Sequence, residues 1–122
     1  LHDALPIYTE DSFDDPDYAA KVCKDITSGA SGADRGILIC GTGIGISIAA
    51  NKCKGIRAAL CGDVFSAKAT RQHNDSNVLC MGERVIGVGL AEMIVDAWIG
   101  TEFEGGRHTR RVEKVMELEK DC

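Results

Sequence analysis

Three short apolar runs constrain this chain most, because each is too brief to form a helix. They are GILIC at residues 36–40, IRAALC at residues 56–61 and NVLCMG at residues 77–82. Continuous apolar runs of this length fit strands that are buried on both faces. Helix-length segments separate them, and this alternation predicts a three-layer α/β/α fold with a mostly parallel sheet. In such sheets, ligands bind beyond the carboxyl ends of the strands.

The first two helical segments flank the first apolar run. DDPDYAAKVCKDI reads as a helix, with Asp15 as its cap, Pro16 in the first helical position and Gly29 at its exit. ISIAANK continues as a helix after a glycine-rich loop. The first helix, the strand and the second helix therefore follow one another with little connecting chain.

Three more helices follow. Residues 64–74 read as a helix that Asp63 caps. In GVGLAEMIVDAWIGTEF, helical spacing puts five apolar side chains on one face, namely Leu90, Ala91, Ile94, Val95 and Trp98. RHTRRVEKVMELEK reads as a charged final helix whose inward residues are Val112, Val115 and Met116.

Size and charge limit the classes of function. The 122 residues fit a single domain, and a net charge of −5 argues against nucleic acid as the main partner. No apolar run approaches the roughly 20 residues that cross a bilayer, and the start lacks the pattern of a signal peptide. We therefore expect a cytoplasmic protein without a membrane partner.

The six cysteines form no CxxC pair, which disfavours a zinc ribbon or a thioredoxin-like site. A disulfide scaffold is also unexpected in a chain with this much aliphatic core. Most of these cysteines are expected to be small buried hydrophobic residues, among them Cys61 and Cys80.

The segment from Cys40 to Gly45, CGTGIG, joins the first strand to the next helix. Glycines let the backbone turn tightly and approach a ligand, and the N–H groups at a helix start attract anions. The spacing matches neither the dinucleotide fingerprint nor a P-loop. A plain tight turn fits the same glycines.

Cys40 makes this loop chemically interesting. A thiol at a helix N-terminus has a lowered pKa, so it can act as a nucleophile or a base near neutral pH. The alternative is a buried strand cysteine.

Other polar residues have both functional and structural interpretations. His73 suits proton transfer, or it is a histidine that the helix dipole favours at a C-terminus. Arg84 follows the third strand and is otherwise a solvated loop residue. Arg107 and Arg111 share a helix face and suit a phosphate, unless they pair in solvent with nearby glutamates, Glu104 or Glu113.

Two long runs carry a resemblance to a known family. GILICGTGIGISIAANKCKGIRAALCGDVFSAKATRQHNDSNVLCMGERVIG and AEMIVDAWIGTEFEGGRHTRRV resemble the type B ribose-5-phosphate isomerases and the related galactose-6-phosphate isomerase subunits. DDPDYAAKV looks like the family's first preserved helix, and the resemblance covers roughly residues 8 to 118. It implies a Rossmann-like fold and an aldose–ketose isomerase of the pentose phosphate pathway that works through an ene-diol.

The resemblance also implies roles for individual residues. Cys40 matches the base that takes the proton next to the carbonyl, and Thr42 and His73 match residues linked to ring opening. Asn74 matches a ligand of a sugar hydroxyl. The loop that holds the ene-diolate oxygen matches Gly41, Gly43, Ile44 and Gly45. Three arginines match binding positions, the last two for phosphate, namely Arg84, Arg107 and Arg111.

The resemblance implies no metal and no organic cofactor. It implies a homodimer or homotetramer with the site shared between subunits. Some family members use a carboxylate as the base. Here the matching position is Ser47 or nearby and carries no acid, which favours Cys40.

The start of the chain departs from the family pattern. The family opens with a strand ending in Asp-His, a helix and a second strand, and that first strand-helix-strand is missing here. His2 and Asp3 stand in the reverse order, with no strand before them. We therefore expect residues 1–7 to be a foreign or artefactual leader and residues 8–122 to be one isomerase domain, incomplete at its N-terminus and weakly active or inactive.

Two alternatives to ribose 5-phosphate isomerisation stay open. One is a galactose-6-phosphate or other hexose-phosphate isomerase with the same chemistry. The other is a non-catalytic phosphosugar-binding subunit, which would keep Arg107 and Arg111 and tolerate the loss of Cys40.

Overall fold

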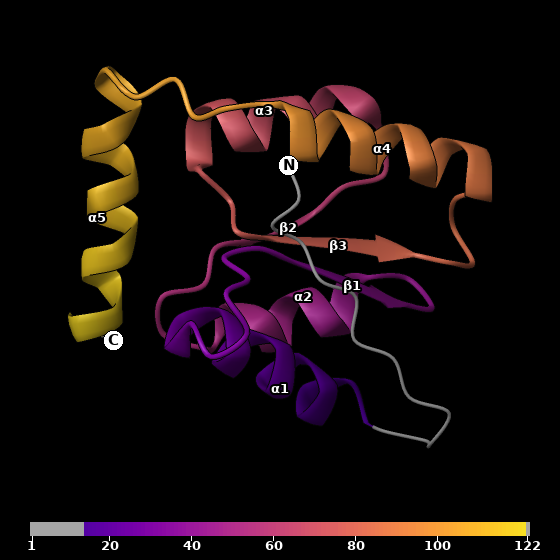
Figure 1. Ribbon diagram of the computed structural model, residues 1–122, viewed down its shortest axis with the longest axis horizontal. Coiled ribbons are helices and arrows are strands. Elements are labelled where there is room, and N and C mark those ends of the chain that lie inside the picture. Colours follow the sequence, from indigo (N-terminus) through magenta and orange to yellow (C-terminus); the bar gives the residue numbers. More distant parts are fainter. Residues whose placement is uncertain (1–13, 122) are drawn as a thin grey trace.

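The computed structural model describes residues 14–121 (Figure 1). The leader expected at residues 1–7 lies outside the described residues. Helices and strands alternate along most of the chain, in the order α1 Asp15–Ser28, β1 Gly36–Cys40, α2 Ile44–Asn51, β2 Ala58–Leu60, α3 Val64–Asn74, β3 Val78–Gly82, α4 Val88–Gly100 and α5 Arg107–Asp121.

The strands form a parallel sheet in the order β1-β3-β2. Gly36 of β1 and Ala58 of β2 both lie opposite Val78, at the start of β3. Helices α1 and α2 cover one face of the sheet, and α3 and α4 cover the other (Figure 1). The predicted three-layer α/β/α architecture is therefore confirmed.

The central strand β3 is buried along its whole length. Because successive side chains of a strand point to opposite faces, it contributes to two cores. Val78 and Cys80 pack in the core under α1 and α2. Leu79 and Met81 pack in the core under α3 and α4, which also contains Trp98.

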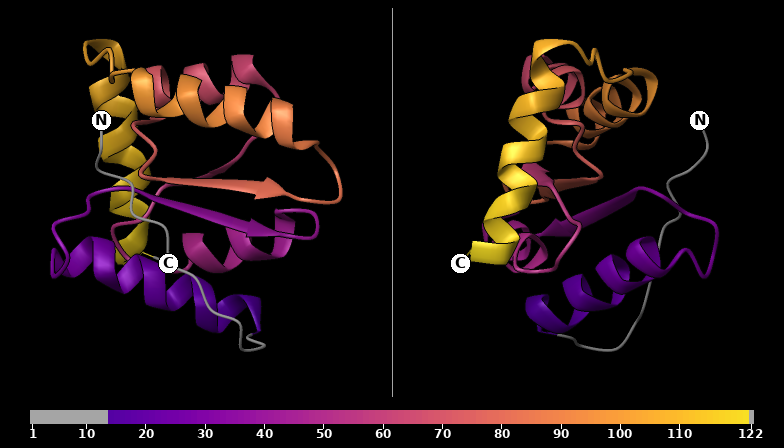
Figure 2. Two further views of the ribbon diagram at one scale, coloured as in Figure 1. Left: turned by 45° about the vertical axis from the view of Figure 1, so that its right-hand side comes forward. Right: turned by 90° about the vertical axis from the view of Figure 1, so that its left-hand side faces the viewer.

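Helix α5 is separate from these layers. It lies beside the starts of the strands and runs from the side of α3 toward the side of α2 (Figures 1 and 2). Two contacts join it to the loop before β2. The N–H of Gly55 donates to Oε1 of Glu119 at 2.7 Å, and Arg57 lies 3.3 Å from the sulfur of Met116. None of the helices between residues 14 and 121 is both long and apolar enough to cross a membrane.

The helix starts match the sequence with two corrections, and the first is that α2 begins at Ile44, two residues before the predicted segment ISIAANK. Asp63 caps α3 as predicted, since its Oδ1 accepts a 2.7 Å hydrogen bond from the N–H of Ser66. Asp14, rather than Asp15, is the N-cap residue of α1, which moves Pro16 to the second helical position. Proline is tolerated there because the first N–H groups of a helix lack intrahelical partners.

Two residues predicted to face inward are exposed. Leu90 of α4 is 37% exposed, because the buried face of that helix is centred on Ile94 and Trp98. Val115 of α5 is 53% exposed, because α5 covers only the end of the sheet. The helical spacing identified these helices but did not fix which face each one buries.

Strand β2 is shorter than the predicted residues 56–61. Before it, the side chain of Asn77 accepts the N–H of Arg57 at 2.8 Å. The side chain of Asn51 bonds both the N–H and the C=O of Ala58, at 2.8 and 2.9 Å. The Asn51 amide takes the place of a neighbouring strand on the outer edge of β2, whereas Asn77, which directly precedes β3, bonds Arg57 from the side of the central strand.

Candidate functional site

The loop after β1 places two reactive side chains at the start of α2. The N–H of Gly43 donates to Sγ of Cys40 at 3.1 Å, and the N–H of Ile44 donates to Oγ1 of Thr42 at 3.2 Å. Cys40 is partly buried, while Thr42 is exposed. The thiol and the hydroxyl are thus held by the backbone of the same turn, where the helix dipole is positive.

Glycine is required at Gly43 and Gly82 for this loop to pack. Gly43 has a φ of +82°, and a Cβ there would lie 2.5 Å from Cδ1 of Leu60 and 2.8 Å from the carbonyl carbon of Met81. A Cβ on Gly82 would lie 2.4 Å from the backbone of Thr42. The loop therefore rests directly on the end of β3.

The turn after β3 adds a cation to this edge of the sheet. The N–H of Glu83 donates to the carbonyl of Cys40 at 2.9 Å, and the N–H of Arg84 donates to the carbonyl of Gly41 at 3.0 Å. A Cβ on Gly41 would lie 3.7 Å from Cδ of Arg84, so the exposed arginine side chain lies against the glycine loop. We call this group, Cys40 to Gly45 with Arg84, the thiol loop.

The remaining predicted residues gather around α5. His73 and Asn74 end α3, and Arg107 and Arg111 lie on the first turns of α5. The imidazole of His73 stacks on that of His108, with ring centroids 4.4 Å apart and planes 19° apart. Neither arginine side chain makes an ion pair within residues 14–121, so both guanidinium groups are available to an anion. Arg107 and Arg111 therefore do not pair with Glu104 or Glu113. The Glu104 carboxylate lies beside His108 instead.

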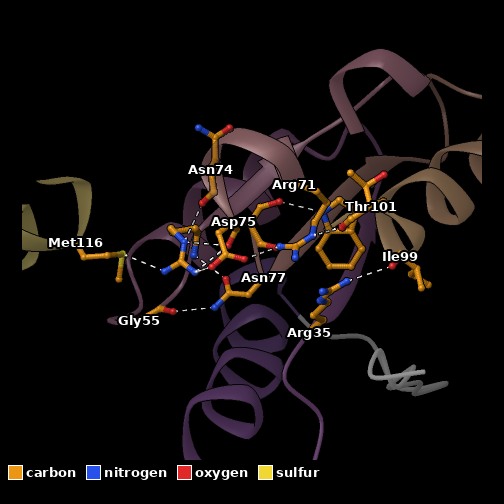
Figure 3. A network of polar contacts seen from close by, with 12 residues as sticks. Arg35, Gly55, Arg71, Asn74, Asp75, Asn77, Ile99, Thr101 and Met116 are labelled. Atoms are coloured by element: carbon orange, nitrogen blue, oxygen red, sulfur yellow. Dashed lines mark hydrogen bonds and ion pairs between the residues drawn. The ribbon is translucent and has the colours of Figure 1, made fainter. Parts of the chain in front are cut away.

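A polar network fixes the turn that carries Asn74 (Figure 3). Arg57 donates to the carbonyls of Asn74 and Asp75 at 3.1 and 2.8 Å. Arg71 is only 3% exposed, and it donates to the carbonyl of Ser76 at 2.6 Å and to the Asp75 carboxylate at 2.9 Å. Asp75 adopts a left-handed conformation, with φ 49°. The side-chain amide of Asn74 points away from this network, where it can meet a ligand (Figure 3).

A cavity of about 750 Å³ lies between α5 and the starts of the strands. His73, Asn74 and Arg111 line it, together with apolar side chains of α5 such as Met116. We call the polar residues His73, Asn74, Arg107 and Arg111 the helix α5 group. It combines an imidazole, an amide and guanidinium groups, which suit the hydroxyls and the phosphate of a phosphorylated sugar.

The thiol loop and the helix α5 group lie at opposite edges of the sheet (Figure 1). Cys40 ends β1, whereas α5 lies beside the starts of the strands. The five residues of β3 separate the two edges by about 13 Å at 3.3 Å per residue. His73 lies on a helix that follows a strand, as predicted, but at its far end. One chain therefore does not bring Cys40 and His73 together.

The buried cysteines behave as predicted for core residues. Burial raises the pKa of Cys61 to about 11, with Asp63 adding to the effect. Burial also raises the pKa of Cys80 to about 12, with smaller contributions from Cys40 and Cys61. Both remain neutral thiols near neutral pH and contribute packing rather than chemistry.

Two residues near His73 had no predicted ligand role. His108 is 7% exposed, and its Nε2 lies 3.5 Å from Oε1 of Glu104. Burial lowers the pKa of His108, and the charges of His73 and Arg107 lower it further. The four-residue spacing of Glu104 and His108 in the sequence indicates that these two side chains can meet. Their contact with His73 depends on how α5 packs, which the spacing does not indicate.

Known proteins resemble this chain along most of its length. The profile of the family described as Ribose/Galactose Isomerase matches residues 3–115. Ribose-5-phosphate isomerase B of Escherichia coli (strain K12) is 53% identical over 113 residues, which are 93% of this chain and 74% of that protein.

Solved structures agree with these sequence matches. Ribose-5-phosphate isomerase B of Clostridium thermocellum has a TM-score of 0.88 at 52% identity, and the match covers 95% of this chain and 77% of that one. Ribose-5-phosphate isomerase B of Mycoplasma genitalium, solved with bound ribulose-5-phosphate, has a TM-score of 0.85 at 43% identity, and the match covers 96% of this chain and 76% of that one.

Proposed function

Since the chain belongs to the Ribose/Galactose Isomerase family, we propose that it is an aldose–ketose isomerase that interconverts ribose 5-phosphate and ribulose 5-phosphate. The observation that carries the proposal is the thiol loop, in which Sγ of Cys40 lies 3.1 Å from a backbone N–H at the start of α2. Proton removal next to a carbonyl needs a base and a stabilised oxyanion, and this arrangement offers both.

The reaction starts from the open-chain aldose. Cys40, as a thiolate, takes the proton from C2, and the electron pair forms a C1–C2 double bond while negative charge moves to O1. The N–H groups of Gly41 and Gly45 stabilise that charge, together with those of Gly43 and Ile44 once these leave Cys40 and Thr42 for the substrate oxygen. The thiol then returns the proton to C1, and a proton moves from O2 to O1, which leaves the ketose. Atoms and charge balance without a cofactor.

The other residues bind and prepare the substrate. Thr42 and His73 move protons between the ring oxygen and the anomeric hydroxyl, so that the sugar opens. Asn74 binds a sugar hydroxyl, Arg107 and Arg111 bind the phosphate, and Arg84 adds positive charge over the thiol loop. Phosphate binding far from C2 positions the reacting carbon.

This mechanism needs two copies of the chain. Because the thiol loop and the helix α5 group lie at opposite edges of one subunit, we propose that Cys40 of one subunit faces His73 of a second. Large apolar side chains are exposed on α2 and on the first turn of α3. Phe65 is 81% exposed, and Ile44 and Ile48 are more than half exposed. A two-fold axis through such a surface would form two equal sites in a homodimer, on which a tetramer could be built.

We further propose that the enzyme acts in the pentose phosphate pathway and in the cytoplasm. Ribose 5-phosphate and ribulose 5-phosphate are intermediates of the pentose phosphate pathway. The cysteines of residues 14–121 are all free thiols, which fits the reducing cytoplasm.

The direct test measures ketose formation from ribose 5-phosphate by the wild type and by the Cys40→Ala variant. Loss of the base should lower kcat by at least about a hundredfold with little change in KM. Unchanged turnover in Cys40→Ala would instead support a non-catalytic phosphosugar-binding subunit. A higher kcat/KM for galactose 6-phosphate than for ribose 5-phosphate would identify the hexose-phosphate alternative.

A further inference from the structure

Three potential metal ligands meet where α3, α5 and the loop before α5 come together. They are His73, Glu104 and His108, and one donor atom from each lies within 4.8 Å of the others. We propose that these three side chains form an inhibitory site for a divalent transition-metal ion, with Zn²⁺ as the best match. Two imidazoles and one carboxylate are a ligand set that zinc accepts.

The donor spacing is close to what zinc needs. Bonds of about 2.0–2.1 Å in a tetrahedral arrangement place neighbouring donors about 3.3 Å apart. The widest of the present donor separations, at most 4.8 Å, would have to close by about 1.5 Å, whereas His108 Nε2 and Glu104 Oε1 are already 3.5 Å apart. His73 and Glu104 are exposed and can rotate, whereas His108 is buried and provides a fixed ligand.

Backbone hydrogen bonds hold the three residues near one another. The N–H of Glu104 donates to the carbonyl of Gln72 at 3.1 Å, which fixes Glu104 beside the last turn of α3. The N–H of His108 donates to the carbonyl of Gly105 at 3.1 Å, which sets the first turn of α5. Closing the site requires the exposed His73 ring to rotate out of its stack on His108, so that the ring nitrogens of both can face one ion.

The contacts around the cluster also bear on metal binding. At 3.5 Å, Nε2 of His108 and the Glu104 carboxylate are too far apart for a strong hydrogen bond. Arg107 and Arg111 oppose a cation, but both are exposed and solvent screens their charge. We therefore expect reversible binding rather than permanent occupancy.

Metal binding would compete with the proposed reaction. His73 is assigned to ring opening, and an imidazole that coordinates zinc cannot exchange protons through the same nitrogen. The inhibitory effect rests on the proposed function, but the binding site itself does not. The two claims can fail separately, because binding is measurable without substrate.

The binding experiment uses the chain without an affinity tag, because a histidine tag would itself bind metal. Co²⁺ is titrated into the wild type and into the Glu104→Gln and His108→Gln variants, and its absorption spectrum is followed. Glu102→Gln is the matched control, since Glu102 is an exposed glutamate two residues away that does not belong to the cluster. Circular dichroism verifies that each variant folds.

We expect one Co²⁺ per chain, no thiolate charge-transfer band, and at least about tenfold weaker binding in Glu104→Gln and His108→Gln than in Glu102→Gln. Absence of Co²⁺ binding, equal binding by all four proteins, or a thiolate band that assigns the metal to cysteine would each overturn the site.

The activity experiment adds Zn²⁺ to the same four proteins during ribose 5-phosphate turnover. The wild type and Glu102→Gln should be inhibited, while Glu104→Gln and His108→Gln should resist. Binding without inhibition would overturn the inhibitory role and leave the metal site standing. A metal-free wild type without isomerase activity would count against the activity of this chain, which is expected to be weak or absent if the domain is incomplete, and not against the metal site.

Discussion

The backbone N–H of Gly43 points at the sulfur of Cys40 from 3.1 Å, and Gly43 adopts a φ of +82° to do so. This conformation favours glycine, because a Cβ there would collide with Leu60 and with the backbone of Met81. The orientation of the proposed base thus depends on a residue that has no side chain.

We expect Gly43→Ala to lower the free energy of unfolding by about 1–3 kcal/mol, because it places a side chain in a left-handed backbone. It should also lower kcat, since the N–H beside Cys40 moves. Urea denaturation and steady-state kinetics measure the two effects. Gly62→Ala is the control, because a Cβ on Gly62 meets nothing within 4 Å. Equal behaviour of the two variants would contradict the prediction.

The cysteines should differ in reactivity. Cys40 is partly buried beside an exposed loop, whereas Cys61 and Cys80 are buried and burial raises their pKa values to about 11 and about 12. We expect iodoacetamide near neutral pH to modify Cys40 at least about tenfold faster than either of the other two. Peptide mass spectrometry over time measures this. Earlier modification of Cys80 than of Cys40 would show that the thiol loop is closed to reagents.

Arg71 should be the most important charged residue for stability near Asn74. Its replacement in Arg71→Gln leaves the buried carbonyl of Ser76 without a charged donor and breaks the ion pair with Asp75. We expect a loss of about 2–3 kcal/mol in the free energy of unfolding. The control is Arg110→Gln, which changes an exposed arginine of α5 and should be nearly neutral. Similar unfolding curves for both variants would rule out this role.

The lowered pKa of His108 predicts a loss of stability in mild acid. At pH values well above the ordinary histidine pKa of 6.5, its imidazole is neutral in both the folded and the unfolded chain and contributes no pH dependence. At lower pH the unfolded chain takes up the proton more readily than the folded chain. The free energy of unfolding therefore decreases as the pH is lowered. Urea denaturation at about pH 7.5 and about pH 5.5 should show a smaller decrease for His108→Gln than for the wild type. An equal decrease would exclude His108 as the cause.

A shared site predicts rescue between two inactive variants. Cys40→Ala and His73→Gln should each be nearly inactive, because each damages both sites of a homodimer. After denaturation, mixing in equal amounts and refolding, half of the dimers contain one of each and keep one intact site. We expect about a quarter of wild-type activity per subunit. Separately refolded samples, mixed afterwards without exchange, are the control, and no recovery in the joint sample would indicate a site formed within one chain.

The fold was predictable because its strands are short, apolar and separated by capped helices. The sequence predicted β1 and α3 with the bounds that the structure has. Strand β2 is shorter than predicted, because side-chain amides of Asn51 and Asn77 bond the backbone at its start, and no local pattern reveals such distant partners. The buried face of α5 was also misjudged, since it depends on where that helix docks.

The candidate site was predictable in its parts and not in its arrangement. Cys40 and its loop stand at the end of a strand, as the sequence indicated, and their chemical roles remain predictions. The eleven residues of α3 span about 16 Å, so a helix of this length returns the chain to the opposite edge of the sheet. That distance separates His73 from Cys40. The stacking of His73 on His108 depends on the packing of α5, which no sequence spacing encodes.

The alternation of β3 between the two cores has a genetic consequence. Inserting or deleting one residue within this strand would reverse the faces of the residues that follow it, turning for example Cys80 toward α3 and α4 and Met81 toward α1 and α2. It would also rotate Gly82 away from the backbone of Thr42. Insertion or deletion of a whole codon within β3 should therefore prevent folding. The exposed turn after α1, at residues 29–32, should tolerate the same change.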